Sequence, residues 1–194
     1  MVSNALAEIE LPQLLLRLGS DHGRIARANA QLADVADRLA NIDAAGLSGD
    51  TQADCDASQL WDEAAALLHF EHHFADRIHH PLEDRLFEAV LLKGLTPTER
   101  HLAFRNLGQH EEIMTMTDAL SAMVRQGQKD PRSSIPVFCE RVADYLALQR
   151  RHMTFEETHM FPLLMSRLEN EDWNQLNDTL QKQFSTNETE SQSP

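Results

Sequence analysis

Turn-forming residues, aromatics and basic side chains are all scarce in this sequence of 194 residues. It contains 7 glycines, 7 prolines and 6% aromatic residues, too few for the many turns and packed rings of a sandwich or barrel. Alanine, leucine, glutamate, glutamine and arginine are common instead, and these residues favour helices. We therefore expect an all-α protein whose length suits one domain with a sizeable core.

Basic residues are outnumbered by acidic ones, 17 against 31, which gives a formal net charge of −14. Nucleic acids and anionic membranes attract basic surfaces, so we expect neither as a partner. No apolar run approaches the roughly 18 residues of a membrane span. The N-terminus "MVSNALAEIELPQLLLRL" also lacks the basic start of a secretion signal. These absences predict a cytoplasmic protein.

Cysteine is rare as well. The two present, Cys55 in a predicted polar loop and Cys139 in a predicted helix, could form one disulfide at most, and we expect reduced thiols. Histidine is the exception, with 10 residues. Their positions carry the functional prediction.

Apolar residues recur at three- and four-residue spacing along four segments, as is typical of helices that bury one face. The predicted helices span about 12–41, 58 to just before Gly94, Pro97 to the "GQKDP" stretch, and Ile135 onward. Before the third of them, "TPTE" at 96–99 supplies an N-cap threonine, a proline at the first helical position and a glutamate at the third. The segment 41–58 is predicted to be a loop.

Four long helices with short connections predict an antiparallel up-and-down four-helix bundle. A short additional C-terminal helix is expected at about 171–184. Residues 1–184 would form the bundle domain, and the polar stretch 185–194 is expected to be a disordered tail.

Each predicted long helix places a histidine on its apolar stripe, and these four candidate ligands are His22, His79, His110 and His152. Two of these are followed four residues later by a glutamate, Glu83 or Glu156, and residues four apart share one helical face. Burying two carboxylates in an apolar core costs several kcal/mol unless a charge compensates them. The pattern therefore predicts a metal site with these six ligands.

Four imidazoles and two carboxylates suit a pair of first-row transition ions, with bridging carboxylates and iron as the best match. A single zinc ion would normally take four ligands and leave the others unused, and calcium and magnesium prefer oxygen. Ordinary hydrogen-bonded core histidines are the alternative without a metal. A ferritin-like carboxylate site is another, and it would draw on Asp21, Asp76, His79, Glu111, Glu156 and His159.

Further histidines lie near the predicted ligands. His80 could replace His79 if Pro81 rotates the helix, since an interior proline removes a backbone hydrogen bond. His72 and His159 lie on the predicted stripes about two turns from ligand histidines, where hydrogen bonding is expected rather than coordination. The remaining three are off the stripes and are expected at the surface: His69, His73 and His101.

The order of these motifs resembles the haemerythrin-like, HHE cation-binding family over nearly the whole chain. The matching strings are "DHGRI" with His22, "HHPLED" with His79 and Glu83, "QHEEI" with His110, and "HMTFEETHMFP" with His152 and Glu156. The resemblance implies a bundle holding two non-haem iron ions with an oxo or hydroxo bridge. It further implies that the protein binds or senses dioxygen, nitric oxide or peroxide.

Two positions depart from the oxygen-carrying members of that family. The oxygen-carrying members look as if they use a His-x-x-x-His pair on the third helix and a His-x-x-x-x-Asp pair on the fourth. Here Met114 lies four residues after His110, and after His152 Glu156 lies four residues on and Glu157 five. The pattern is closer to members with four histidines and two glutamates, which are linked to nitrosative and oxidative stress. Three roles stay open: gas binding or sensing, enzymatic removal of peroxide or nitric oxide, and iron storage or iron-centre repair.

Overall fold

The computed structural model describes residues 12–45, 51–132 and 134–179, and nearly all of them are helical. The longer helices are α1 (Gln13–Ala44), α2 (Thr51–Phe70), α4 (Pro97–Gly127) and α5 (Ile135–Phe155). Two shorter ones are α3 (His80–Leu91) and α6 (Phe161–Arg167), and residues 170–179 form a last helical segment. No strand occurs among these residues, which confirms the all-α prediction. The predicted tail, 185–194, lies outside them.

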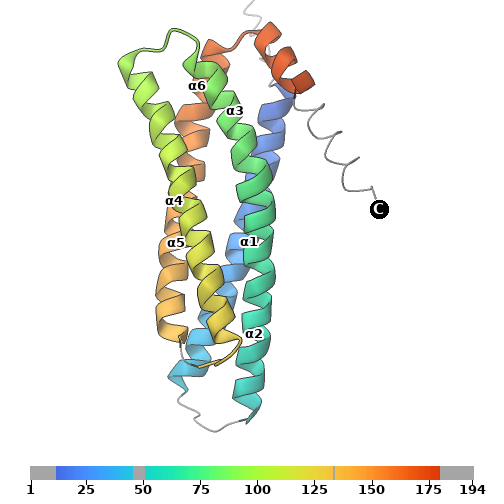
Figure 1. Ribbon diagram of the computed structural model, residues 1–194, viewed down its shortest axis with the longest axis vertical. Coiled ribbons are helices and arrows are strands. Elements are labelled where there is room, and N and C mark those ends of the chain that lie inside the picture. Colours follow the sequence, from blue (N-terminus) through green and yellow to red (C-terminus); the bar gives the residue numbers. More distant parts are fainter. Residues whose placement is uncertain (1–11, 46–50, 133, 180–194) are drawn as a thin grey trace, which may run out of the picture.

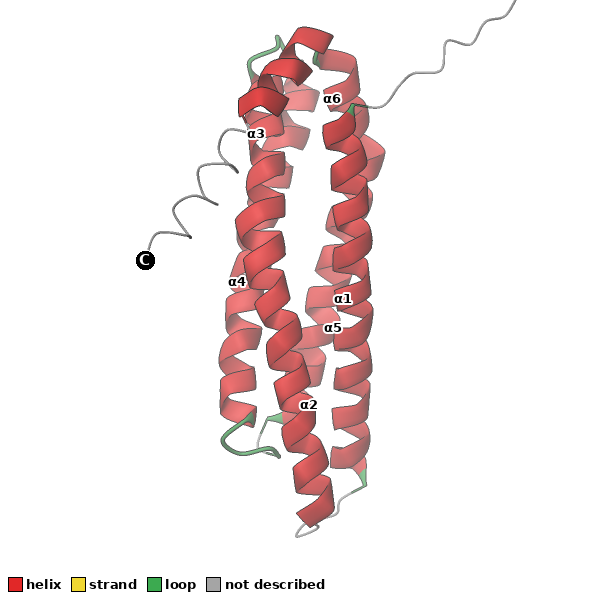
Figure 2. Ribbon diagram, turned by 90° about the vertical axis from the view of Figure 1, so that its right-hand side faces the viewer, coloured by secondary structure: helices red, strands yellow, loops and turns green. Residues whose placement is uncertain are grey.

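The helices lie side by side in an elongated bundle (Figures 1 and 2). α1 and α4 each pack against both α2 and α5, so these helices enclose a common interior. The segment 170–179 sits at one end of the bundle beside α3, where Asp172 accepts a hydrogen bond of 2.7 Å from Lys93 (Figure 1). Nowhere in the described residues does a helix combine the length and apolar character that crossing a bilayer requires.

Helix α4 begins as its sequence predicts. Thr96 Oγ1 accepts a hydrogen bond from the Glu99 amide, and the Glu99 carboxylate accepts one of 2.8 Å from the Thr96 amide. This reciprocal pair satisfies two amides that a helix start leaves without partners.

The predicted loop over 41–58 is wrong at both ends, because α1 continues to Ala44 and α2 begins at Thr51. The buried face of the added part of α2 consists of small residues, Ala53 and Ala57. Alanines contribute little to hydrophobic periodicity, so the start of this helix gave only a weak signal.

Both cysteines are free thiols, as predicted. Cys55 is exposed on α2 rather than placed in a loop. Cys139 is half-buried on α5, where its Sγ donates to the Ala36 carbonyl at 3.2 Å and burial raises the pKa of the thiol.

Two stretches of π-helix interrupt the regular helices, Glu71–His79 between α2 and α3 and Glu156–Met160 between α5 and α6. Each ends two residues before a proline, Pro81 or Pro162. A proline inside a helix lacks the usual N–H donor and collides with the carbonyl four residues earlier, and wider turns relieve both problems. Residues in the wider turns therefore leave the 3.6-residue period on which the sequence analysis relied.

The two larger apolar clusters of the described residues lie one on each side of a polar layer. One contains Trp61 and Phe138, and the other contains Phe87 and Leu164. A small third one consists of Ile25, Phe74 and Ala75. The Trp61 ring meets Phe138 edge-on with 4.7 Å between centroids, and its Nε1 donates to the Pro131 carbonyl at 2.9 Å. These contacts fix the indole at the end of α4.

Gly127 lies against this indole, and a Cβ added there would stand 2.3 Å from a Trp61 ring carbon. Gly127→Ala should therefore destabilise the fold by roughly 1–3 kcal/mol, because a fully buried ring must shift. Gly108 on the same helix has open space around the equivalent position, so Gly108→Ala is the control and should be neutral or stabilise by up to about 1 kcal/mol. Urea unfolding measures both, and equal effects would contradict the packing argument.

Four buried polar residues lie together at the ring of Tyr145, which belongs to the apolar cluster that contains Trp61. They are Glu71, Thr117, Tyr145 and Gln149, each at most 1% exposed. Gln149 Nε2 donates a hydrogen bond of 2.8 Å to the Tyr145 hydroxyl. Burial, reinforced by the negative charge of Asp76, raises the pKa of Glu71 from 4.5 to about 8. The Glu71 carboxyl is therefore neutral in the folded protein at neutral pH.

This raised pKa makes the fold less stable as pH increases. The unfolded chain loses the Glu71 proton near pH 4.5 and the folded protein near pH 8, so between these values stability falls by roughly 1.4 kcal/mol per pH unit. Glu71→Gln should flatten that fall, seen as a smaller difference in melting temperature between about pH 6 and about pH 9 with a chelator present. Glu140→Gln, at an exposed site on α5, should leave the slope unchanged. Identical slopes for Glu71→Gln and the unaltered protein would refute the prediction.

Candidate metal centre

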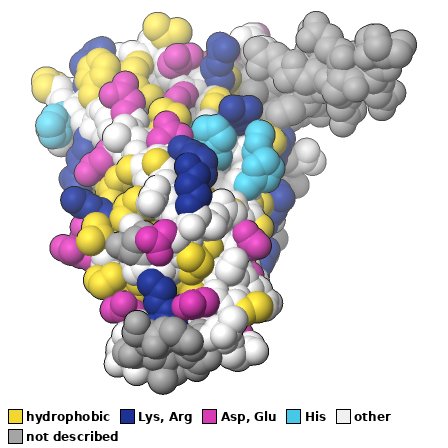
Figure 3. Space-filling view, turned by 60° about the horizontal axis from the view of Figure 1, so that its bottom comes forward, with side chains coloured by type: hydrophobic (Ala, Val, Ile, Leu, Met, Phe, Trp, Pro, Cys, Tyr) yellow, Lys and Arg dark blue, Asp and Glu magenta, His cyan; other side chains and the backbone are white. Residues whose placement is uncertain are grey.

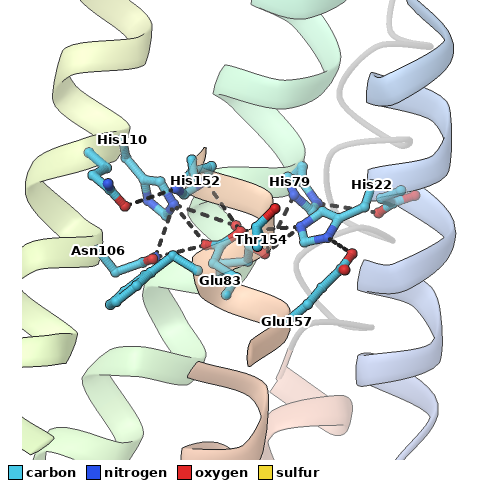
Figure 4. A network of polar contacts seen from close by, with 12 residues as sticks. His22, His79, Glu83, Asn106, His110, His152, Thr154 and Glu157 are labelled. Atoms are coloured by element: carbon cyan, nitrogen blue, oxygen red, sulfur yellow. Dashed lines mark hydrogen bonds and ion pairs between the residues drawn. The ribbon is translucent and has the colours of Figure 1, made fainter. Parts of the chain in front are cut away.

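Six histidine and glutamate side chains meet between the two apolar clusters (Figure 4). They are the six predicted from the sequence: His22 on α1, His79 ending the first π-helix, Glu83 on α3, His110 on α4, His152 on α5 and Glu156 starting the second π-helix. Each is at most 3% exposed. The fold thus brings residues that are distant in sequence to one buried level.

The carboxylate of Glu83 lies among histidines from three helical segments. Its Oε1 is 3.5 Å from His22 Nε2 and 3.4 Å from His79 Nε2. Its Oε2 is 3.5 Å from His110 Nε2. The two oxygens therefore face different histidines, as a bridging carboxylate requires.

The carboxylate of Glu156 occupies a matching position. Its Oε2 is 3.2 Å from His22 Nε2 and 3.3 Å from His152 Nε2, and its Oε1 is 3.4 Å from His110 Nε2. All four histidines therefore turn Nε2 toward the two carboxylates, which leaves Nδ1 free to face the surrounding protein.

These side chains form two overlapping groups in which the potential ligand atoms lie within 4.8 Å of one another. The first contains His22, His79, Glu83 and Glu156, and the second contains Glu83, His110, His152 and Glu156. Both Glu83 oxygens, Oε2 of Glu156 and Nε2 of His22 have no hydrogen-bond partner. Polar atoms buried in this way are costly, and two cations sharing the carboxylates would satisfy them.

The centre lies within a region that matches a known domain. The Hemerythrin HHE cation binding domain matches residues 15–164, which include all six side chains. The chain belongs to this family. Comparisons with curated proteins and with solved structures gave no match. Membership of the haemerythrin HHE family confirms the resemblance read from the sequence and supports cation binding at the centre.

In this haemerythrin HHE domain, the acid after each central glutamate contacts a histidine of another helix. Asp84 Oδ1 is 2.7 Å from His110 Nδ1, and Glu157 Oε1 is 2.9 Å from His22 Nδ1. Accepting the outer N–H fixes each ring with Nε2 toward the centre. Glu157 is the acid five residues after His152, but neither its contact with His22 nor that of Asp84 with His110 was predicted, although the pairs "ED" at 83–84 and "EE" at 156–157 were the available signal.

Two amides from α4 add further contacts. The fully buried Asn106 donates from Nδ2 to Glu156 Oε1 at 2.8 Å, and Gln109 Oε1 lies 3.5 Å from His152 Nδ1. Asn106 sits four residues before His110 on the buried face of α4. An asparagine on an otherwise apolar stripe was the sequence signal for this contact, and the contact was not predicted.

His79 and His80 are both buried, but they face different parts of the centre. The His79 ring lies 5.0 Å from His22, whereas the His80 ring stacks on His110 at 4.4 Å between centroids. Both rings are therefore turned inward, and His79 is the one that lies with His22, Glu83 and Glu156, as the sequence predicted.

The stripe positions predicted for His72 and His159 are wrong. His159 is exposed and packs against Phe155 with 5.2 Å between ring centroids. His72 has a side chain 38% exposed, and its Nδ1 is 3.5 Å from the buried Asp76. Both histidines lie within π-helices, whose wider turns carry them off the regular stripe.

The ferritin-like set of ligands does not assemble. Glu111 and His159, which it would need, are exposed. Asp21 is buried, but its Oδ2 faces the outer nitrogen of His79 at 3.8 Å rather than the carboxylates. The three histidines predicted at the surface are all exposed, as expected: His69, His73 and His101.

Opposite charges in the centre shift the pKa values of its groups. Burial would lower the pKa of His22, but Glu156 and Glu83 outweigh burial and raise it to about 10. Burial likewise opposes ionisation of Glu83, yet His79 and the other imidazoles hold its pKa well below 4.5. The carboxylates are therefore ionised, with protons on histidines as the balancing charge. A bound cation would replace those protons and release them.

The hydrogen bond between Asp84 and His110 yields a prediction about affinity. Asp84→Ala should weaken binding of ferrous or cobaltous ions by roughly 10–100-fold, because the imidazole loses the acceptor that orients it. Glu88→Ala, at an exposed position on the same helix, should leave affinity unchanged. Anaerobic titration followed by absorption or calorimetry measures both, and equal affinities for the two variants would count against an orienting role.

Proposed function

We propose that the protein is an antiparallel up-and-down four-helix bundle that holds two non-haem iron ions with an oxo or hydroxo bridge and binds dioxygen, nitric oxide or peroxide. One observation carries the proposal. Glu83 and Glu156 each belong to both groups of ligand atoms in the centre, an arrangement suited to two ions joined by carboxylates.

The chemistry of the donors supports iron. Four imidazole nitrogens and two carboxylates form the mixed nitrogen and oxygen set that first-row transition ions take. Structural zinc sites close with four ligands, and calcium and magnesium bind oxygen. A single zinc ion would leave two of the six donors unused in a buried place, and calcium or magnesium would leave the imidazoles without a metal.

The burial of the centre supports a small ligand. Every ligand side chain is at most 3% exposed, so an organic substrate could not reach it without opening the bundle. Apolar residues pack on both sides, as Phe161 shows by stacking on the His22 ring at 5.5 Å. Diatomic molecules and peroxide are small enough to enter by local fluctuations.

Bound iron would supply redox chemistry and an open coordination position for the small ligand. The chain's own residues supply the rest. Glu83 and Glu156 balance the charge of the ions, while Asp84 and Glu157 fix the rings of His110 and His22 from outside. Surrounding apolar residues exclude bulk water, which would otherwise compete with the small ligand for the open position.

Anaerobic reconstitution with ferrous iron tests the proposal. The protein should take up about two ions per chain, and exposure to dioxygen, nitric oxide or peroxide should produce charge-transfer bands. Glu83→Ala should lose most of the iron because it removes a ligand shared by both ions, whereas His101→Ala, at an exposed position, should retain it.

The outcomes separate the possible roles. Reversible bands with dioxygen or nitric oxide support binding or sensing, and steady consumption of peroxide or nitric oxide supports an enzyme. Iron uptake without a response to any ligand supports storage. Iron content near one or zero per chain would contradict the two-iron centre.

A further inference from the structure

His80 is a seventh side chain at the centre, and its surroundings differ from those of its neighbour His79. The two ring centroids are 5.6 Å apart. His79 faces His22, whereas His80 lies 4.4 Å from the ring of His110 and 5.6 Å from that of His152. Consecutive residues of a helix point about 100° apart. His79 and His80 can therefore face two different groups of side chains in the centre, one around His22 and the other around His110 and His152.

The nitrogens of His80 lack hydrogen-bond partners although the residue is only 2% exposed. One of them lies within 4.8 Å of ligand atoms on both His110 and His152. The nearest acid is Asp76, whose Oδ1 is 3.5 Å from His80 Nδ1. An imidazole buried without partners is costly, and a metal bond at Nε2 with Asp76 facing Nδ1 would satisfy both nitrogens.

Stacking alone does not account for a histidine here. Phenylalanines serve as flat apolar neighbours elsewhere in the centre, Phe161 against His22 at 5.5 Å and Phe87 near His110 at 6.3 Å. A phenylalanine at position 80 could stack on His110 without bringing two unpaired nitrogens into the core.

We propose that His80 is a third imidazole ligand to the ion held by His110 and His152, and that Asp76 is the positioning residue for its ring. This inference rests on the proposed function. It makes the two halves of the centre unequal, with His22 and His79 on one side and His80, His110 and His152 on the other. His79 ends the first π-helix and His80 begins α3, and both side chains are buried.

Anaerobic titration with cobaltous ion tests the assignment, because the visible absorption of cobalt reports the number and kind of its ligands. His80→Phe keeps a flat ring beside His110 but removes the nitrogens. One of the two ions should then bind at least about tenfold more weakly and change its spectrum, while the other stays unchanged. Asp76→Asn should weaken the same ion by a smaller factor. His73→Phe, at an exposed position on the same π-helix, is the control and should behave as the unaltered protein.

A second variant separates coordination from packing. His80→Gly should lose the same spectral feature, and added imidazole should restore it, whereas pyrrole, a ring of the same size without an available nitrogen lone pair, should not. Equal rescue by both rings, or an unaltered cobalt spectrum in His80→Phe, would overturn the assignment. If the unaltered protein binds only one ion, the two-metal proposal fails, and the spectrum of that ion in His80→Phe still decides whether His80 is a ligand.

Discussion

The attraction between two buried carboxylates and the imidazoles around them is the constraint on which this bundle depends. Glu83 and Glu156 are fully buried, and leaving them without balancing charge would cost several kcal/mol each. α1, α4 and α5 must therefore each present a histidine at the same height in the bundle, between the two apolar clusters. Apolar contacts alone would allow these helices to shift along one another. The apolar stripes define which faces meet. The charged layer defines their axial register, in the way that single buried polar residues set the alignment of coiled coils.

The two π-helices of the bundle lie next to this layer of buried histidines and glutamates. Both π-helices adjoin it, one ending at His79 and the other beginning at Glu156, and each is followed by a proline. Regular helices also bury neighbouring positions, as α1 does with Asp21 and His22, so the burial of both His79 and His80 does not by itself require a wider turn. The π-turns nonetheless lie beside the buried polar layer, in keeping with the tendency of such turns to occur at functional sites.

Features that depend on residues close together in the sequence could be predicted, whereas contacts between different helices could not. The helical class, the cap at Thr96 and the six central side chains follow from local spacing, and the structure brings those six together. The inward placement of His159 failed because the period was assumed constant through a proline-induced π-turn. The contacts of Asp84 and Glu157 could not be predicted for another reason: which histidine an acid reaches depends on how helices lie beside each other, and no spacing within one helix contains that information.

The two halves of the chain contribute to the centre in corresponding ways. In each, a first helix offers one histidine, and the following helical line offers a histidine, a glutamate four residues later and an acid directly after it. Each acid reaches the single histidine of the opposite half, Asp84 to His110 and Glu157 to His22. In each of the two groups of four donors, one half of the chain supplies three side chains and the other half supplies one glutamate. Neither half therefore completes a group alone, and the packing of the two halves against each other builds the candidate site.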